Sequence, residues 1–318
     1  MPEHVILDQR ATPETYSETG YLAANPDVAA AVAAGAFPSG RRHFDLFGER
    51  EGRMQRAVSA IAARRARKRD RLLAALDLGL PHTERPDGTF DFLSDALRQE
   101  TGIAATDAVS ANPYDDDVMG LVERHAGGLV LDCGAGRRPV YFTDVVNFEI
   151  VPYDTTDVVG VGEALPFRDG AFDAVISVAV LEHVRDPFRC AREIVRVLKP
   201  GGELICVVPF LQPQHGYPHH YYNMAPQGLR ALFERDLAIE RHDVSLAMLP
   251  VWSLAWIARS WAAGLTGTTA QTFLDLRVGE LLAPMEHLLA QPWVRELPPE
   301  KNMELASATK IAARKPQA

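Results

Sequence analysis

Cysteine is scarce in this chain of 318 residues, and the three cysteines are Cys133, Cys190 and Cys206. No two of them form a Cys-x-x-Cys pair, and none stands at a zinc-type spacing from a histidine. This pattern excludes a disulfide framework and the common kinds of structural zinc site. We therefore expect no bound metal. Scarce, unpaired cysteine is typical of a protein from a reducing compartment.

Long apolar runs are also missing. No stretch reaches the roughly 18 consecutive apolar residues that a membrane-spanning helix needs. The first residues lack the basic region and the apolar core of a signal peptide. We therefore expect a cytoplasmic protein. Hydrophobic residues make up 47% of the chain and charged residues 24%, which is ordinary for a folded protein and argues against extensive disorder.

Positive charge is in deficit, since the formal net charge at pH 7 is -9 and the isoelectric point is near 5.6. Overall charge therefore does not favour nucleic acid as a partner. Residues 53–71 differ, because they contain eight basic side chains against one acid, Asp70. These are Arg53, Arg56, Arg64, Arg65, Arg67, Lys68, Arg69 and Arg71. We interpret the segment as a solvated helix face, with contact to nucleic acid or to anionic lipid as the alternative.

Four successive parts are expected along the chain. They are a helical module at 1–52, a basic helical linker at 53–80, a helical extension at 81–127 and a catalytic domain at 128–318. In the first part, Asn25 and Pro26 are good helix-start residues and Gly35 is a good helix end. The proline-rich and glycine-containing stretch 81–89 indicates a break in regular structure.

From residue 128 onward, short apolar runs alternate with helical stretches. We predict strands at 129–131, 141–150, 157–161, 172–177, 203–208, 237–244 and 306–314, and helices at 187–198 and 225–235. This alternation predicts an α/β fold, a Rossmann-like, seven-stranded and mostly parallel sheet with helices on both faces. Residues 250–300 then form a helical insertion before the last strand. They contain Trp252, Trp256, Trp261 and Trp293, which favours a buried or interfacial helix.

The strongest chemical signal lies at the end of the first predicted strand. Leu129-Val130-Leu131 runs directly into Asp132, and Gly134 and Gly136 follow. Two spaced glycines let the backbone approach a ligand without a Cβ collision, although a tight turn with a purely structural role has the same pattern. Glu149 ends the next predicted strand, 17 residues after Asp132. An acid there either accepts hydrogen bonds from ribose hydroxyls or lies on the surface.

Three further motifs follow in order. They are the stretch from Glu163 to Ser177, the run Val180-Leu181-Glu182-His183-Val184, and the run from Leu198 to Leu204. Together with the glycine turn, they resemble the class I S-adenosylmethionine-dependent methyltransferases, particularly the branch that includes quinone and sugar methyltransferases. The resemblance covers about residues 128–208 and implies S-adenosylmethionine as the cofactor.

The resemblance also implies a role for individual residues. Asp132, Gly134 and Gly136 would hold the methionine end of the cofactor, Glu149 the ribose, Gly162, Glu163 and Ala164 the adenine, and Ser177 and Val180 the floor near the sulfonium. This chain departs from the family pattern at Val161, which stands where an acid usually bonds the adenine amino group. Arg137 likewise replaces a small residue.

A candidate general base lies in the loop after the fifth predicted strand. Residues 209–222 contain His215, His219 and His220, and histidine titrates in the range that a base needs. His215 and His220 are the leading candidates, with Tyr221 as a positioning group. Their alternative role is to pack over the cofactor. A metal site in this loop is a further, less favoured alternative, because the three histidines show no recognised metal-ligand spacing. His183 either faces the donor or acceptor, or is satisfied by backbone at a helix start.

The first part of the chain carries a second resemblance. Tyr-Leu-x-x-Asn-Pro-Asp-Val at 21–28 and His-Phe-x-x-Phe-Gly-x-x-Glu-Gly-Arg at 43–53 resemble a small module attached to bacterial enzymes of surface-glycan assembly. This resemblance implies a glycan or other small-molecule acceptor, methylated on oxygen. It also implies contact with a membrane surface or a glycan-assembly protein through the module and the basic helix. The alternatives are an RNA or protein methyltransferase that grips its substrate with residues 53–71, and a cofactor-binding scaffold without catalysis.

Overall fold

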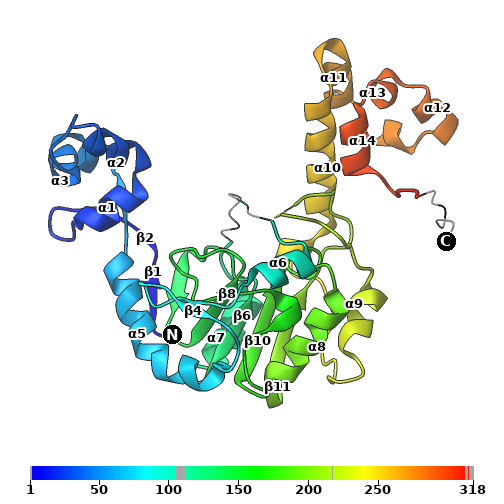
Figure 1. Cartoon of the computed structure of the whole chain (residues 1–318). Coiled ribbons are helices and arrows are strands. Elements are labelled where there is room, and N and C mark those ends of the chain that lie inside the picture. Colours follow the sequence, from blue (N-terminus) through cyan, green and yellow to red (C-terminus); the bar gives the residue numbers. More distant parts are fainter. Residues whose placement is uncertain are drawn as a thin grey trace.

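A computed structural model describes residues 2–104, 106, 110, 112–216, 218–311 and 314 of the chain (Figure 1). Its centre is a seven-stranded sheet with the order β11-β10-β6-β8-β9-β5-β4. The strands are β11 Leu198–Val207, β10 Phe172–Val178, β6 Val130–Cys133, β8 Val145–Glu149, β9 Val158–Val159, β5 Phe90–Asp91 and β4 Thr83–Glu84. All neighbours in this sheet are parallel except β4 and β5. The predicted α/β class and the seven-stranded, mostly parallel sheet are therefore confirmed.

Helices cover both faces of the sheet because the strands are apolar on both sides. Leu131 and Val175 belong to one buried cluster, which also holds the inner face of α8 Pro187–Val197. Their chain neighbours Val130 and Ala174 belong to a second cluster, with the inner face of α7 Asp116–Arg124. Successive side chains of a strand point to opposite faces, so alternate residues enter different cores.

Two of the predicted strands are wrong. Residues 237–244 form no strand, and β11 is an edge of the sheet. Leu237 and Ile239 do pack against the core. The charged run 240–243 that follows offers no further apolar side chains, so the segment lacks the apolar residues that a buried strand needs. Residues 306–311 are also irregular, while residues 312 and 313 lie outside the described part of the chain. The sheet is completed instead by β4, which lies in the stretch predicted as a break, and by β5, which directly follows that stretch.

The predicted strand 141–150 is two strands in the structure. β7 Val140–Phe142 and β8 are separated by Thr143 and Asp144, and only β8 joins the central sheet. β7 pairs antiparallel with β1 His4–Ile6 near the start of the chain. β1 is followed by β2 Asp8–Arg10, which pairs with β3 Met54–Arg56. The N-terminal part is thus joined to the central domain through a strand pair.

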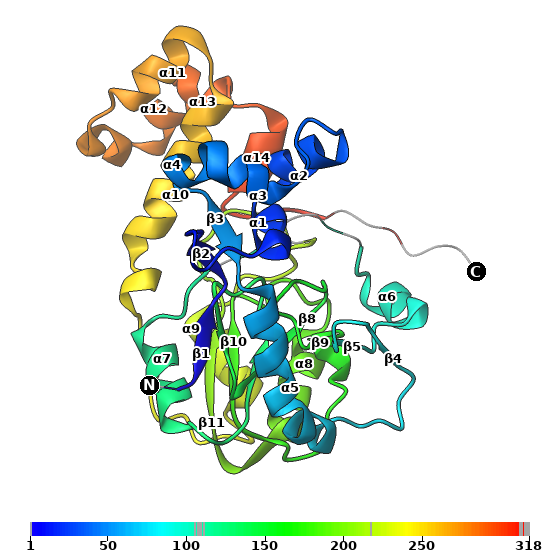
Figure 2. The ribbon, with the colours of Figure 1, turned by 90° about the vertical axis from the view of Figure 1, so that its left-hand side faces the viewer.

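The rest of the N-terminal part is helical. It contains α1 Glu18–Ala24, α2 Pro26–Ala33, α3 Gly40–His43, a turn of π-helix at Phe44–Gly48 and α4 Glu49–Glu51. Tyr21, Val28 and Phe44 form its own small core. The helix α5 Val58–Ala75 follows and lies beside β1, on the side of the molecule that Figure 2 faces.

The basic segment keeps a solvated side, where Arg67 and Arg69 pair with acids at the surface, but its cations are not unpaired. All eight of its basic side chains form ion pairs within the chain. Arg65 and Lys68 reach Asp157, which is completely buried, and Arg71 reaches Asp144. The positive charge of this helix therefore offsets acids of the central domain, which explains why an acidic chain has one strongly basic stretch.

The C-terminal part is a cluster of helices. They are α10 Pro250–Gly264, α11 Gly267–Leu274, α12 Met285–Leu289, α13 Pro292–Arg295 and α14 Pro299–Leu305. Leu265, Trp293 and Leu297 form its core, with Trp261 packed against them. It does not precede a final strand within the described residues. Figure 1 shows this cluster and the N-terminal part rising from the same side of the sheet.

Two helices remain, α6 Asp95–Thr101 and α9 Pro226–Phe233. None of the helices in the described part of the chain has the length and hydropathy that crossing a bilayer requires.

Candidate functional site

The turn after β6 requires its two glycines. Gly134 and Gly136 have φ angles of 80° and 62°, which side chains rarely adopt. A Cβ on Gly134 would lie 2.4 Å from Val180, and a Cβ on Gly136 would lie 2.5 Å from the carbonyl oxygen of Ser110. The fold therefore brings Gly134 and Val180 together from two separate motifs. Both lie where β6 and β10 end, at the edge where parallel sheets bind ligands.

Glu149 holds this turn in place. One carboxylate oxygen accepts a hydrogen bond from the Gly136 N–H at 2.7 Å, and the other accepts one from the Ile150 N–H at 2.7 Å. Burial raises the pKa of Glu149, although these two hydrogen bonds act in the opposite direction. The acid at the end of β8 and the glycine turn after β6 are thus in direct contact.

Asp132 is fully buried, and its carboxylate is already bonded by the protein. Arg138 donates to it from Nε at 2.7 Å and from Nη2 at 3.1 Å, and the Tyr114 hydroxyl donates at 2.5 Å. The guanidinium also lies over the Tyr114 ring. Sequence reasoning gave Arg138 no role, and it set aside Tyr114 because Asn112-Pro113-Tyr114 only partly matches an Asn-Pro-Pro-Tyr motif and precedes the glycine turn. Arg138 neutralises the buried acid, and the pair stiffens the segment that follows the turn.

The predicted adenine segment, Gly162–Ala164, is one turn of 3-10 helix. Glu163 is buried, and its carboxylate accepts hydrogen bonds from the backbone N–H of Arg185 at 3.0 Å and of Asp186 at 3.4 Å. A Cβ on Gly162 would lie 2.6 Å from Cys190 Sγ on α8. The segment is therefore packed against the start of α8, and glycine is needed for the close approach.

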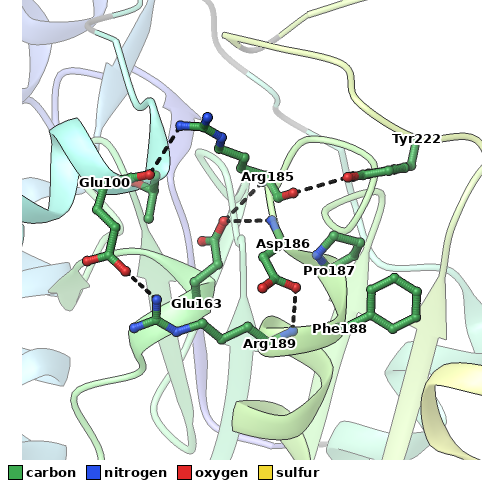
Figure 3. A pocket seen from close by; sticks show the side chains of 9 residues that line it. Glu100, Glu163, Arg185, Asp186, Pro187, Phe188, Arg189 and Tyr222 are labelled. Carbon is green, nitrogen blue, oxygen red and sulfur yellow. Dashed lines mark hydrogen bonds and ion pairs between the residues drawn. The ribbon is translucent and has the colours of Figure 1, made fainter. Parts of the chain in front are cut away.

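A polar cleft of about 360 Å³ opens beside this segment (Figure 3). Its lining consists of Glu100, Thr101, Glu163, Arg185, Asp186, Pro187, Phe188, Arg189 and Tyr222. Arg189 pairs with the Glu100 carboxylate, and Arg185 donates to the Glu100 carbonyl oxygen at 3.3 Å. Two arginines from the start of α8 thus hold the end of α6 at the rim of the cleft.

The segment after β10 contains the predicted floor residues. Ser177 is buried, and Val180 lies against Gly134. Ala179, between them, has a φ of 56° and is the one non-glycine with a positive φ among the described residues. A left-handed alanine costs free energy and persists where surrounding structure enforces it, and such residues cluster at functional sites.

The loop after β11 brings its histidines to the same edge of the sheet. The ring centroids of His215 and His220 are 4.3 Å apart, and His183 lies 5.0 Å from His215. His220 has both ring nitrogens in use, since Nδ1 accepts from the His215 N–H at 3.1 Å and Nε2 lies 2.9 Å from the Asn223 amide oxygen. His215 Nδ1 bonds the Pro213 carbonyl oxygen at 2.9 Å. Burial lowers the pKa of His215.

Tyr221 is attached to this group through its backbone. Its N–H donates to the Glu182 carbonyl oxygen at 2.7 Å, while its side chain is partly exposed. Sequence reasoning gave Glu182 no role, yet its side chain is fully buried beside His183, with Glu182 Oε1 3.8 Å from His183 Nε2. In the sequence, the one sign that could have pointed to Glu182 was its position next to His183, which was already a candidate site residue. Burial raises the pKa of Glu182 to about 8 and lowers that of His183 to about 4.

Comparison with known proteins agrees with this arrangement of motifs. Residues 133–206 match the family described as Methyltransferase domain. A demethylmenaquinone methyltransferase from Renibacterium salmoninarum is 33% identical over 114 residues, which are 36% of this chain and 42% of that protein. A ubiquinone/menaquinone biosynthesis C-methyltransferase from Pseudoalteromonas translucida is 38% identical over 69 residues, which are 20% of this chain and 27% of that protein.

The solved YcgJ protein from Bacillus subtilis is 17% identical, with a TM-score of 0.32, over 50% of this chain and 88% of that one. The chain spans less than half the length of the two quinone methyltransferases, at 42% and 27%. The family match begins at Cys133, and so it leaves out the N-terminal part. Residues 133–206 are therefore similar to a methyltransferase domain.

Proposed function

We propose that the whole chain transfers a methyl group from S-adenosylmethionine to a small-molecule acceptor, and that the acceptor atom is a hydroxyl oxygen of a sugar or glycan. One observation carries the first part of this proposal. The glycine turn after β6 and the acid that ends β8 meet, with the Gly136 N–H bonded to the Glu149 carboxylate at 2.7 Å. Two motifs of the donor-binding pattern thus form one structure at the ligand-binding edge of the sheet.

The residues at this edge fit the donor. Gly134 and Gly136 let Val180 and the Ser110 carbonyl oxygen pack directly against the turn, where a Cβ would collide with them. The Glu149 oxygens accept one backbone hydrogen bond each, so each keeps a lone pair for a ribose hydroxyl. When bound, S-adenosylmethionine supplies a methyl group on a positively charged sulfur, and the sulfur departs with the bonding electron pair. We assign ribose binding to Glu149, adenine contact to Gly162, Glu163 and Ala164, and the floor to Ser177 and Val180.

Asp132 acts differently in our proposal from what the family resemblance implies. Its carboxylate already has three hydrogen bonds, from Arg138 and Tyr114. We therefore propose that Asp132 shapes the turn from beneath, and that the backbone of Gly134 and Gly136 contacts the methionine end. In-line transfer depends on alignment, and a rigid turn reduces the motion that must be lost when donor and acceptor are brought together.

The acceptor hydroxyl must lose its proton as its oxygen forms the new bond to carbon, so a proton-handling group is needed. We propose that His215, His220 and Tyr221 face the acceptor. Of the two histidines, His215 is favoured, because both ring nitrogens of His220 are bonded within the protein. His220 then positions the His215 backbone by accepting a hydrogen bond from its N–H. Tyr221 positions the loop through the hydrogen bond from its N–H to the Glu182 carbonyl oxygen.

The sugar assignment rests on the N-terminal part, whose residues 21–28 and 43–53 resemble a module of surface-glycan enzymes. Contact with a membrane surface or a glycan-assembly protein through this part belongs to the same proposal. The alternative of an RNA or protein methyltransferase loses its main support, because all eight cations of 53–71 pair with acids of the chain. A scaffold without catalysis remains the second candidate, favoured by the pairing of His220 inside the protein.

Calorimetric titration with S-adenosylmethionine and with S-adenosylhomocysteine tests the donor assignment. We expect both to bind, and we expect Gly134→Ala to abolish binding because its Cβ would meet Val180. Gly279→Ala is the matched control, since a Cβ there meets nothing within 4 Å and the residue has no positive φ. Absence of binding by the wild-type chain would overturn the proposal.

A methyl-transfer screen tests the acceptor. We expect turnover with nucleotide sugars or glycan fragments and none with RNA. If donor binds but no acceptor is methylated, and the double variant His215→Ala/His220→Ala changes nothing in cells that contain the natural acceptor, the scaffold function is supported instead.

A further inference from the structure

Three side chains with metal-ligating atoms converge next to the donor edge. They are Glu182 and His183, which follow β10, and His215, from the loop after β11. One ligand atom from each lies within 4.8 Å of the other two. Zn–N and Zn–O bonds are about 2.0–2.2 Å long, so one ion spans ligand atoms up to about 4 Å apart. Small side-chain rotations therefore bring this set to coordination distance.

The environment of the Glu182 carboxylate independently indicates a site for a cation. The residue is completely buried, and neither carboxylate oxygen has a hydrogen-bond partner among the described residues. Buried carboxylates are normally hydrogen-bonded, paired with a cation or bound to a metal. A bound divalent ion would supply the positive partner that this buried carboxylate needs.

The two imidazoles are oriented as metal ligands usually are. His183 Nδ1 donates to the His219 carbonyl oxygen at 2.5 Å, and His215 Nδ1 donates to the Pro213 carbonyl oxygen at 2.9 Å. A carbonyl on Nδ1 sets the tautomer that carries the lone pair on Nε2. His220 cannot join them, because its two ring nitrogens are already bonded. Its ring lies against His215 instead.

We propose that Glu182, His183 and His215 bind one divalent transition-metal ion, with positions left open for an oxygen of the acceptor. Two imidazoles and a carboxylate favour ions such as Zn²⁺, Mn²⁺, Fe²⁺ or Co²⁺ over Mg²⁺ and Ca²⁺. The acceptor part of this inference rests on the proposed function, whereas the metal site does not. As a ligand of the ion, His215 would serve the acceptor in place of acting as the base. The ion would lower the pKa of a bound acceptor hydroxyl, whose proton would pass to solvent water.

Metal binding by the chelator-treated full-length chain tests the site without any assay of activity. We expect calorimetry with Zn²⁺ and Mn²⁺ to give one ion per chain, and Co²⁺ to give visible absorption bands of a nitrogen- and oxygen-ligated ion. Glu182→Gln and His215→Ala should each weaken binding at least 100-fold. His219→Ala is the matched control from the same loop. It keeps the backbone carbonyl that orients His183, and it should bind like the wild type.

Glu182→Gln conserves shape and removes a buried charge, so it should fold, and a thermal melt without metal checks this. The wild-type melting temperature should rise on adding Zn²⁺, and that of Glu182→Gln should not. No stoichiometric binding by the wild type would overturn the site. Equal binding by Glu182→Gln, or loss of binding in His219→Ala, would overturn the ligand assignment.

Different experimental results would contradict the metal site and the proposed function. Metal binding without donor binding leaves the site intact and contradicts the methyltransferase function of the chain. Donor binding together with methyl transfer that is unchanged by a chelator contradicts the role of the ion in acceptor binding. We expect chelation to abolish transfer and leave donor affinity unchanged, with activity restored by Mn²⁺ or Co²⁺.

Discussion

At the scale of single residues, the chain concentrates its polar interactions in a few buried groups. Asp157 shows how such a group is balanced. It accepts from Lys68 Nζ at 2.6 Å, from the Tyr141 hydroxyl at 2.5 Å and from the Asn147 N–H at 2.9 Å, with Arg65 at 3.4 Å. Burial lowers the pKa of Lys68, and Asp157 opposes that shift. This network joins α5 to the sheet.

Removing the carboxylate of Asp157 should be costly. In Asp157→Ala, Lys68 loses the partner of its buried ammonium, and Arg65 loses its closest acid. We expect the free energy of unfolding to fall by about 3–5 kcal/mol, as measured by urea denaturation. Glu84→Ala breaks an exposed ion pair with Arg69 and serves as the control, with a much smaller loss. Equal losses in the two variants would contradict the assignment of Asp157 as the anchor of α5.

The acid Asp173 predicts how stability depends on pH. Partial burial raises its pKa, but hydrogen bonds from Lys199 and from the Leu129 N–H outweigh this effect, so the pKa lies below its ordinary value of 3.8. A group with a lowered folded pKa stabilises the protein above its unfolded pKa and loses that contribution as pH falls through the folded value. The stability difference between wild type and Asp173→Asn should therefore be constant near neutral pH and shrink below pH 3.8. Urea denaturation at stepped pH checks this, and a difference that grows on acidification would contradict it.

At the scale of elements, capping connects helix stability to the site. The Asp186 side chain caps α8 by accepting from the Arg189 N–H at 2.9 Å, while the Asp186 N–H itself donates to Glu163. The start of α8 therefore determines where the predicted adenine segment lies. Asp115 caps α7 in the same way, by accepting from the Val118 N–H at 3.0 Å, and has no contact with Glu163.

Replacing either cap with alanine separates these two effects. Asp186→Ala and Asp115→Ala should each lower the free energy of unfolding by about 1 kcal/mol. Only Asp186→Ala should also weaken donor binding, because Glu163 loses a fixed N–H partner. Denaturation and calorimetry on both variants check the prediction. Equal donor affinities in the two would show that the α8 cap does not position the adenine segment.

The errors in strand prediction also belong to this scale. Residues 237–244 and 306–314 have strand-like composition, but a strand needs a partner and two faces to bury, and local sequence does not supply them. β5 and β4 consist of two residues each, too few to show an alternating pattern. β5 joins the sheet by pairing with β9, and β4 joins it by pairing with β5. β6, β8 and β10 lie within predicted strands because their sequences are mostly apolar.

At the scale of the whole molecule, the C-terminal helices reach the site through α10. The rings of His215 and Trp256 are 5.2 Å apart, and the Gln214 N–H donates to the Glu304 carbonyl oxygen on α14 at 2.9 Å. Trp256 therefore limits the motion of a residue that we place at the acceptor. This contact gives α10 a physical connection to the proposed acceptor site.

Trp256→Ala should loosen His215 without disturbing the donor. We expect a higher KM for the acceptor and weaker Mn²⁺ binding, with unchanged affinity for S-adenosylmethionine. Trp252→Ala, one turn earlier on α10 and 59% exposed, is the control and should leave all three unchanged. Steady-state kinetics and calorimetry check the pair. Weaker donor binding in Trp256→Ala would mean that α10 supports the donor cradle instead.

The sequence by itself determined the features that depend on neighbouring residues. The apolar runs of β6 and β10 specify buried parallel strands, and the left-handed turn at Gly134 and Gly136 needs glycine whatever surrounds it. These local features were enough to indicate the fold class and the donor motifs. Glu149 was found for the same reason, because it ends an apolar run.

Only the tertiary structure decided how distant charges are paired. Lys68 and Asp157 are 89 residues apart, and Asp132 meets Tyr114 and Arg138 from two different segments. Glu182, His183 and His215 converge because β10 and β11 end side by side. Electrostatic and coordination energies depend on separation in space and on burial, and neither can be calculated from the order of residues along the chain.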